Sequence, residues 1–132
     1  MMHLKKDIHP EDLLYLTPEM RHLLLMAYFY FKARDMKFVI TSLNKDRKNV
    51  KSISRTHQEG RGVDIRSAHL SQEQIKNAVE YLNAEFREIA AISSKDRKPR
   101  ACIYHNNHIH LQVKRAENGF FQKYLNKILA IF

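Results

Sequence analysis

His57, Asp64 and His110 have the residue types and the spacing of a metal site. In residues 108–113, polar and aliphatic side chains alternate strictly, which predicts a β-strand with His108 and His110 on one face and three aliphatic residues on the other. Same-face residues of a strand lie about 7 Å apart, so both imidazoles can reach one small site while only one binds a metal directly. We therefore expect further ligands from another segment.

The further ligands are expected from residues 57–66. The aliphatic residues on either side of Asp64 predict a second short strand with one apolar and one polar face. If the two strands pair with their apolar faces together, Asp64 and His110 emerge on the same side. His57 lies seven residues before Asp64, across a segment with two glycines that can fold the imidazole back. Three ligands then converge.

Two histidines and one carboxylate, with a fourth position left for water, form the ligand set of a catalytic rather than a structural zinc. Zinc lowers the pKa of bound water to about 7 and polarises a carbonyl group. The set therefore suggests hydrolysis of an amide. Each member alone has a plain alternative as a solvated loop or strand residue, so the prediction depends on the constellation.

The block Ser54-x-x-His57-x-x-Gly60-x-Gly62-Val63-Asp64-Ile65, followed by His108-x-His110, resembles the zinc peptidases of the M15 group. This group includes D-alanyl-D-alanine carboxypeptidases, L-alanyl-D-glutamate endopeptidases of phage lysins and related murein endopeptidases. The similarity covers roughly residues 37–114. It implies a hedgehog or D-Ala-D-Ala peptidase-like fold and a peptidoglycan peptidase with His57, Asp64 and His110 as zinc ligands.

The resemblance also implies roles for residues that do not bind the metal. Many M15 members carry a catalytic glutamate three residues before the last histidine, where this chain has Asn107. In the branch with a His-x-His motif, the first histidine is the base or stabilises the transition state, which corresponds to His108. The substrate-binding arginine of the family has no clean counterpart here, and Arg55 and Arg61 are the substitutes that we favour over Lys45 and Arg47.

The net charge of +9 indicates anionic partners. With the resemblance, we expect a peptidoglycan peptide as substrate and anionic cell-wall polymers as partners, and we disfavour nucleic acid. The first residues contain no apolar stretch of a secretory signal, and no segment approaches a membrane span. We therefore expect synthesis in a cytoplasm, with action at the wall after release or from a virion. Cys102 is expected to be a buried small residue.

A length of 132 residues suits one domain with a single core. The sequence predicts an α+β fold, in which a small antiparallel sheet has helices on one face and the metal site on the other. The helices are indicated by apolar periodicity, by the Thr17-Pro18 helix start and by the capping box at residues 71–74. We expect an arm over 1–16 with about one helical turn, helices over 17–31, 71–89 and 120–129, and strands over 37–42, 62–66, 101–104 and 108–113.

Three rival functions remain open at this stage. The first is a non-catalytic phage structural or wall-binding module that keeps the fold, which Asn107 favours. The second is a metal-dependent nuclease, since His105-Asn-Asn-His108 resembles part of an HNH signature, although the elements do not follow in the order of that site. The third is a different zinc amidohydrolase. We expect His105 to be a turn or supporting residue, and Gln112 either orients a ligand or faces solvent.

Overall fold

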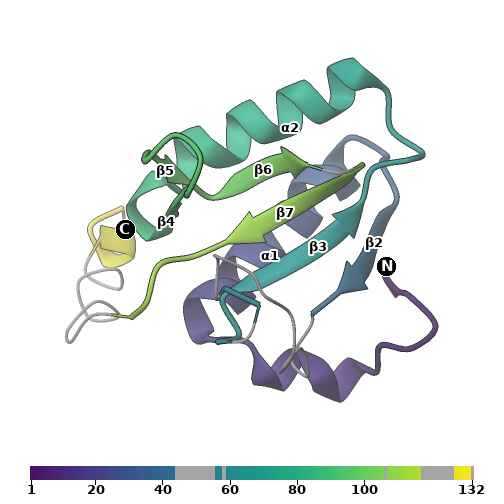
Figure 1. The fold of residues 1–132 in the computed structure, drawn as a ribbon, viewed down its shortest axis with the longest axis horizontal. Coiled ribbons are helices and arrows are strands. Elements are labelled where there is room, and N and C mark those ends of the chain that lie inside the picture. Colours follow the sequence, from purple (N-terminus) through teal and green to yellow (C-terminus); the bar gives the residue numbers. More distant parts are fainter. Residues whose placement is uncertain (44–55, 58, 106, 117–126, 132) are drawn as a thin grey trace.

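The computed structural model describes residues 1–43, 56–57, 59–105, 107–116 and 127–131 (Figure 1). Its elements are β1 (Met2–Leu4), the 3-10 helix η1 (Pro10–Tyr15), α1 (Pro18–Ala33), β2 (Phe38–Ser42), β3 (Gly62–Arg66), α2 (Gln72–Glu85), the 3-10 helix η2 (Arg87–Ile89), β4 (Ala91–Ile92), β5 (Pro99–Arg100), β6 (Cys102–His105) and β7 (His108–Gln112). The predicted α+β class is confirmed.

The main sheet has five strands in the order β1-β2-β3-β7-β6. β2, β3, β7 and β6 pair antiparallel, but β1 runs parallel to β2, with Met2 opposite Phe38 and Leu4 opposite Ile40. The sheet is therefore mixed, and the prediction of a purely antiparallel sheet is wrong at this edge. The reason is the connection: η1 and α1 carry the chain back to the same end of the sheet before β2 begins, as in any parallel crossover.

α1 begins with the signal that the sequence predicts, and it extends two residues beyond the predicted end at residue 31. The Thr17 side chain accepts a hydrogen bond from the Met20 amide at 3.2 Å, and Pro18 occupies the first helical turn. Beyond the helix, Asp35 takes a positive φ of 55° and turns the chain into β2. These ends place the buried face of α1 against the sheet.

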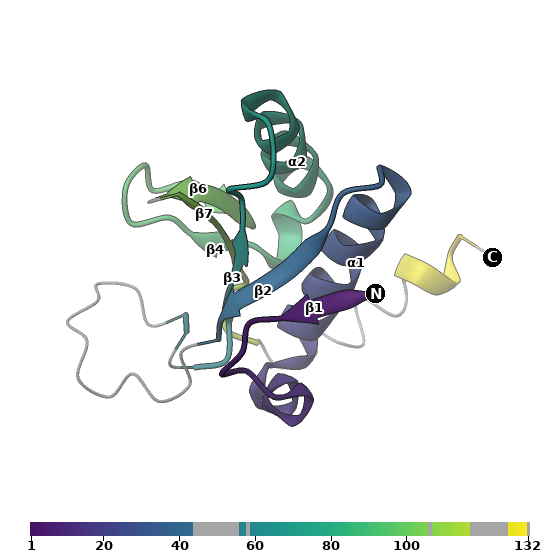
Figure 2. The same cartoon turned by 90° about the vertical axis from the view of Figure 1, so that its right-hand side faces the viewer.

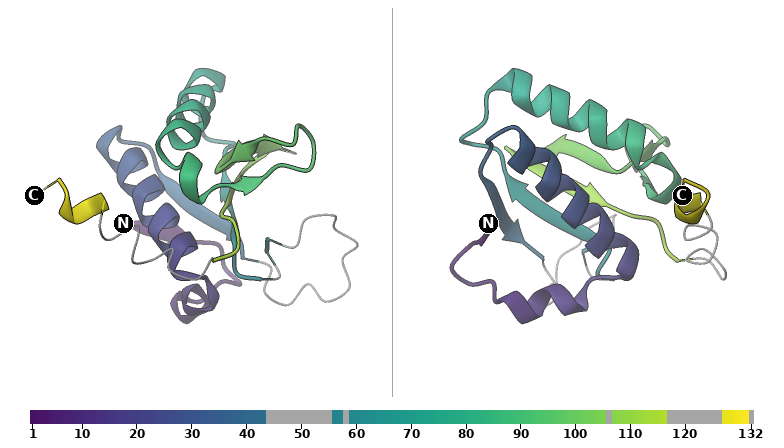
Figure 3. Two further views of the ribbon diagram at one scale, coloured as in Figure 1. Left: turned by 90° about the vertical axis from the view of Figure 1, so that its left-hand side faces the viewer. Right: turned by 180° about the vertical axis from the view of Figure 1, so that it is seen from behind.

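Both long helices cover the same face of the sheet, as the edge-on view shows (Figure 2). Seen from behind, α1 and α2 both cross the sheet (Figure 3). The core lies between the two layers and is closed by aliphatic and aromatic side chains that are almost fully buried: Met20, Leu23, Phe31, Phe38, Ile40, Val63, Ile65, Leu82, Ile109, Leu111 and Val113. The opposite face of the sheet is thereby left for the polar side chains of β3 and β7.

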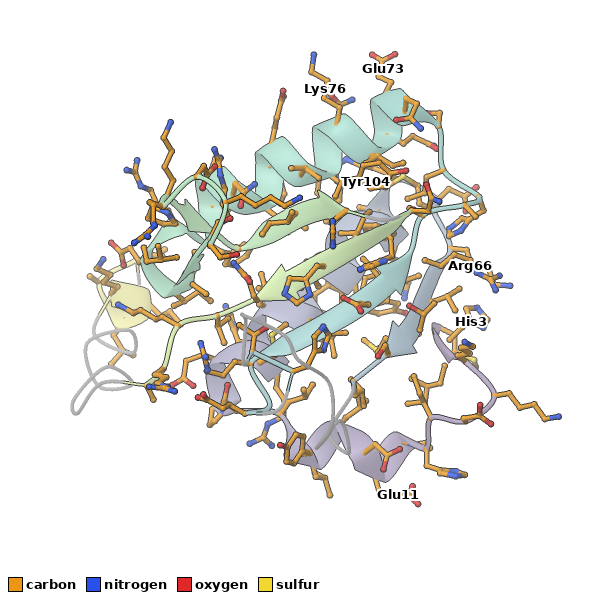
Figure 4. The ribbon with its side chains drawn as sticks, viewed as in Figure 1. His3, Glu11, Arg66, Glu73, Lys76 and Tyr104 are labelled. Carbon is orange, nitrogen blue, oxygen red and sulfur yellow. The ribbon has the colours of Figure 1, made fainter. Side chains whose placement is uncertain are left out.

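α2 begins with the predicted capping box, in which Ser71 and Gln74 bond reciprocally at 3.0 and 2.9 Å. Glu73 and Lys76 project from its outer side (Figure 4). The helix ends at Glu85, and residues 87–89 form the separate turn η2. The predicted single helix over 71–89 therefore continues too far. The break lets Ile89 stay buried while the chain turns toward β4.

β4 and β5 form a small hairpin between the predicted helix over 71–89 and the predicted strand over 101–104, where no strand is expected. Ala91 pairs with Arg100 and Ile92 with Pro99, and Arg97 takes a positive φ of 60° in the connection. The hairpin is tied to the main sheet by a bridge between Ala90 and Val113. Its turn projects on the side of the sheet opposite the helices (Figure 2).

At the sheet edge opposite β1, α2 contacts the backbone of β6. The Asn83 side chain donates to the Cys102 carbonyl at 2.8 Å and accepts from the Cys102 amide at 3.0 Å. The Cys102 side chain is buried, as predicted.

The helix predicted over 120–129 lies mostly outside the described residues. Among the residues that are described there, Lys127 pairs with Glu88 in η2. None of the helices in the described part of the chain is long and apolar enough to cross a membrane.

Candidate metal centre

The pairing of β3 with β7 brings Asp64 and His110 together, because these two residues are direct cross-strand partners. Cross-strand partners project on the same face of a sheet, so Asp64 and His110 emerge opposite the helices, while their aliphatic neighbours Val63 and Ile109 enter the core. The predicted pairing, with Asp64 and His110 on one side of the sheet, is confirmed. Period-2 alternation excludes a slip by one residue, which would turn the apolar face of one strand away from the core.

His57 reaches the same face through a tight turn before β3. Within this turn, the Arg61 amide donates to the Thr56 carbonyl at 2.6 Å and the Gly60 amide donates to the His57 carbonyl at 3.2 Å. Gly60 has a φ of +70°, and a Cβ there would lie 2.5 Å from the Tyr15 carbonyl oxygen. Only glycine accepts both conditions without strain. The turn therefore folds the imidazole back as the sequence predicts.

Three imidazoles face one carboxylate oxygen, Oδ1 of Asp64. Nδ1 of His110 lies 2.9 Å from it, Nε2 of His57 lies 3.3 Å and Nε2 of His108 lies 3.6 Å. The donor atoms of His57, Asp64 and His110 all lie within 4.8 Å of one another. These three residues form a cluster that could hold a metal ion.

The remaining ring nitrogens of the two clustered histidines face acceptors. Nε2 of His110 lies 3.1 Å from Oε1 of Gln112, and Nδ1 of His57 lies 3.4 Å from the Leu43 carbonyl. A neutral imidazole that donates from one nitrogen has a lone pair on the other, and metal-binding histidines are commonly oriented in this way. With a metal bound, the lone pairs would fall on Nδ1 of His110 and Nε2 of His57, the two atoms that face Asp64; without one, protons on these nitrogens donate to its carboxylate.

The donor set fits a divalent cation on electrostatic grounds. Two nitrogen lone pairs directed at a carboxylate oxygen repel it, and a proton or a cation between them turns each repulsion into an attraction. Burial alone would raise the pKa of Asp64, but the hydrogen bonds and charge of His110 and His57 outweigh burial and hold that pKa well below its usual range. Asp64 is therefore ionised at neutral pH, as a metal ligand must be.

Gly62 leaves the space that the cluster occupies. A Cβ at this position would lie 2.8 Å from Oγ1 of Thr56, 3.1 Å from Cε1 of His110 and 3.1 Å from the His57 amide nitrogen. All three neighbours belong to the cluster or to the turn that presents it. The second glycine of the segment therefore serves close approach, whereas Gly60 serves the turn.

His108 lies closer to the cluster than strand spacing predicts. The expected separation of about 7 Å applies to backbone positions on one face, but the side chain reaches across to within 3.6 Å of Asp64. Its cross-strand partner Arg66 extends outward from the end of β3 (Figure 4). His105 is the last residue of β6 and is exposed, with its ring centre 5.7 Å from that of His108.

Of the positions considered for other catalytic or binding roles, Asn107 and Arg61 are described, and each makes hydrogen bonds with other parts of the chain. Asn107 occupies the turn between β6 and β7 with a φ of 62°, and its carbonyl accepts from the Ser67 hydroxyl at 2.7 Å. The Arg61 guanidinium donates to the Val113 carbonyl at 2.8 Å and to Glu59 at 3.2 Å, so it is already bonded to two groups of the protein itself. Arg55 lies outside the described residues. Substrate binding by either arginine stays a prediction.

Two further residues contact His110. Gln112 is buried rather than solvent-facing, and its Oε1 lies 3.1 Å from Nε2 of His110. Oγ1 of Thr56 lies 3.4 Å from Nε2 of His110, the same nitrogen that faces Gln112. No sequence signal points to Thr56, because its role depends on the turn that places it beneath the imidazole.

Comparisons with protein-family models, with curated proteins and with solved structures found no match to this chain.

Proposed function

We propose that this protein is a zinc-dependent peptidoglycan peptidase, which hydrolyses a peptide bond in a murein stem or cross-bridge, as phage lysins do. The observation that carries the proposal is the convergence of His57 Nε2 and His110 Nδ1 on Asp64 Oδ1, with the outer nitrogen of each ring facing an acceptor. The hedgehog or D-Ala-D-Ala peptidase-like fold and the choice of zinc are part of the same proposal.

In this proposal, His57, Asp64 and His110 hold the metal. Zinc, when bound in such a site, activates water and polarises a carbonyl group. His108 is the group that moves a proton, because its Nε2 faces the cluster while its side chain remains 30% exposed and accessible to a substrate. The sheet face opposite the helices leaves room for an extended peptide over β3 and β7.

Glu59 is a poor alternative base. It accepts two hydrogen bonds from Arg115, at 2.8 and 2.6 Å, and a third from Arg61. The hydrogen bond from Arg115 lowers the pKa of Glu59 to about 2, so the carboxylate has little affinity for a proton at neutral pH. Asn107 supplies no carboxylate. Among the described residues, His108 is therefore the candidate best placed to act as a base.

The murein substrate is supported by the resemblance of residues 54–65 and 108–110 to the M15 peptidases, and the net charge of +9 suits an anionic wall. The test is a zymogram on purified sacculi with zinc-loaded, chelator-treated and zinc-restored protein, beside a plasmid-cleavage lane. Zinc content is measured on the same samples. Cleared murein that disappears with chelator and returns with zinc is the expected result.

Matched variants make the test specific for the cluster. Asp64→Asn and His110→Ala should lose both zinc and clearing, whereas His3→Ala removes an exposed imidazole and should keep both. A zinc content near one equivalent in Asp64→Asn or His110→Ala would contradict the proposed ligand set. DNA cleavage without murein clearing would establish the nuclease instead.

A non-catalytic wall-binding module is the second candidate, favoured by Asn107 at the position where many M15 members have a glutamate. It would bind zinc and sediment with sacculi without releasing soluble peptides. Sedimentation and peptide release, measured on one preparation, separate the two candidates.

A further inference from the structure

We infer that Gln112 is a positioning residue, held by the β4–β5 hairpin, that selects Nδ1 of His110 as the atom directed at Asp64 and the metal. The inference rests on the proposed metal site. The small hairpin contributes no ligand to the cluster, yet through Gln112 it affects how the cluster binds a metal.

The Gln112 amide is locked in one orientation. The side chain is buried, with the residue only 4% exposed, and its Nε2 donates to the Arg100 carbonyl at 2.9 Å and, more weakly, to the Ala91 carbonyl at 3.5 Å. Exchanging the amide oxygen and nitrogen would place Oε1 against these two carbonyl oxygens. The nitrogen therefore faces the hairpin, and Oε1 faces His110.

The orientation of the amide determines the tautomer of His110. Oε1 is an acceptor only, and it lies 3.1 Å from Nε2 of the imidazole, so a ring that gives its Nδ1 lone pair to a metal can donate its one proton from Nε2 to Gln112. In the neutral ring, Nδ1 then has the lone pair, 2.9 Å from Oδ1 of Asp64. The hairpin thus acts on the metal site through one amide and one imidazole.

The backbone explains why the amide cannot move aside. Ala91 and Arg100 are cross-strand partners in the hairpin, so the Gln112 amide bonds to both of its strands at one level. On β7, the Gln112 backbone amide donates to the Ala101 carbonyl at 2.9 Å, which fixes the other end of the side chain. On β3, the partner of Gln112 is Gly62, which has no side chain to displace the amide.

Two variants separate a positioning role from a merely structural one. Gln112→Glu keeps an acceptor toward His110 but loses the amide donor toward the hairpin, whereas Gln112→Met has similar volume and loses both. If Gln112 positions His110, Gln112→Met should bind zinc about 10- to 100-fold more weakly than wild type, the usual cost of losing such a partner. Gln112→Glu should stay within a few-fold of wild type. Zinc affinity is measured by competition with a chromophoric chelator.

A second measurement tests the tautomer itself. In zinc-loaded protein at about pH 8.5, nitrogen NMR should show His110 bound to zinc through Nδ1 and protonated at Nε2 in wild type, and a mixed or reversed pattern in Gln112→Met. This readout needs no enzymatic activity.

Several results would overturn the inference. Equal loss of zinc affinity in both variants would mean that Gln112 only anchors the hairpin, and wild-type affinity in Gln112→Met would mean that it has no role. In zinc-loaded wild type, a His110 protonated at Nδ1 would also refute it, even if neither variant folded. Wild type that binds zinc but cleaves no murein would count against the proposed function alone.

Discussion

Replacing Gly62 with alanine should damage the metal centre more than the fold. The new Cβ would lie 2.8 Å from Oγ1 of Thr56 and 3.1 Å from both Cε1 of His110 and the His57 amide nitrogen. An ordinary contact needs at least about 3.4 Å, so each neighbour must retreat by a few tenths of an ångström. Thr56 is 4% exposed and cannot swing into solvent, and His110 is held by Asp64 and Gln112.

Overpacking of this kind typically costs about 1–3 kcal/mol. For a domain of this size, that corresponds to a fall in Tm of about 3–12 °C. Because two of the three displaced groups belong to ligands, zinc affinity should fall about 10- to 100-fold as well. Thermal unfolding of the chelator-treated protein gives the first quantity, and chelator competition gives the second.

The double variant Gly62→Ala/Thr56→Ala provides the control. It removes the closest contact and leaves only the two at 3.1 Å. Gly62→Ala should therefore cost less stability in the Thr56→Ala background than it costs in wild type. Wild-type stability and zinc affinity in Gly62→Ala would refute the argument that this glycine makes room for the site.

Three further outcomes are expected. His108→Ala should keep stoichiometric zinc but lose about 10²- to 10⁴-fold in turnover of a soluble stem peptide; loss of zinc would make His108 a ligand instead. Burial raises the pKa of the Cys102 thiol, so Ellman's reagent should titrate no thiol until the protein is unfolded, and rapid labelling of native protein would contradict the buried position. Because Arg115 holds the folded-state pKa of Glu59 below its unfolded value of about 4.3, the pair should stabilise the protein above that pH and lose its effect as the pH falls toward about 2. Glu59→Gln should flatten this part of the stability profile, and an unchanged acid unfolding curve would show that the pair contributes nothing.

The sequence predicts the central site well because alternation leaves little freedom. The aliphatic residues flanking Asp64 and His110 must both enter the core, and a one-residue slip between the two strands would prevent this. The return of His57 follows from the glycines between it and Asp64. The distance between the side chains of His108 and Asp64 could not be predicted. Strand spacing gives the separation of backbone positions, whereas the position of an imidazole also depends on side-chain rotation.

The short strands could not be predicted, because their pairing depends on tertiary contacts. β1 has three residues and β4 and β5 have two each, too few for a periodic pattern. The proline at the start of β5 also argues against a strand on sequence grounds. The role inferred for Gln112 depends on this hairpin. From the sequence, Gln112 could therefore be either a residue that orients a ligand or a residue that faces solvent.

The contact between Asn83 and Cys102 limits how a peptide can approach the sheet. An exposed edge strand invites a further strand to pair with it, and peptide-binding proteins often use this mode. Here the side chain of α2 already holds both backbone groups of Cys102, so an incoming strand would have to displace it. In the proposed function, a peptide that engages the imidazoles would then lie across β3 and β7 on the sheet face opposite the helices, where recognition depends on side chains rather than on added backbone pairing.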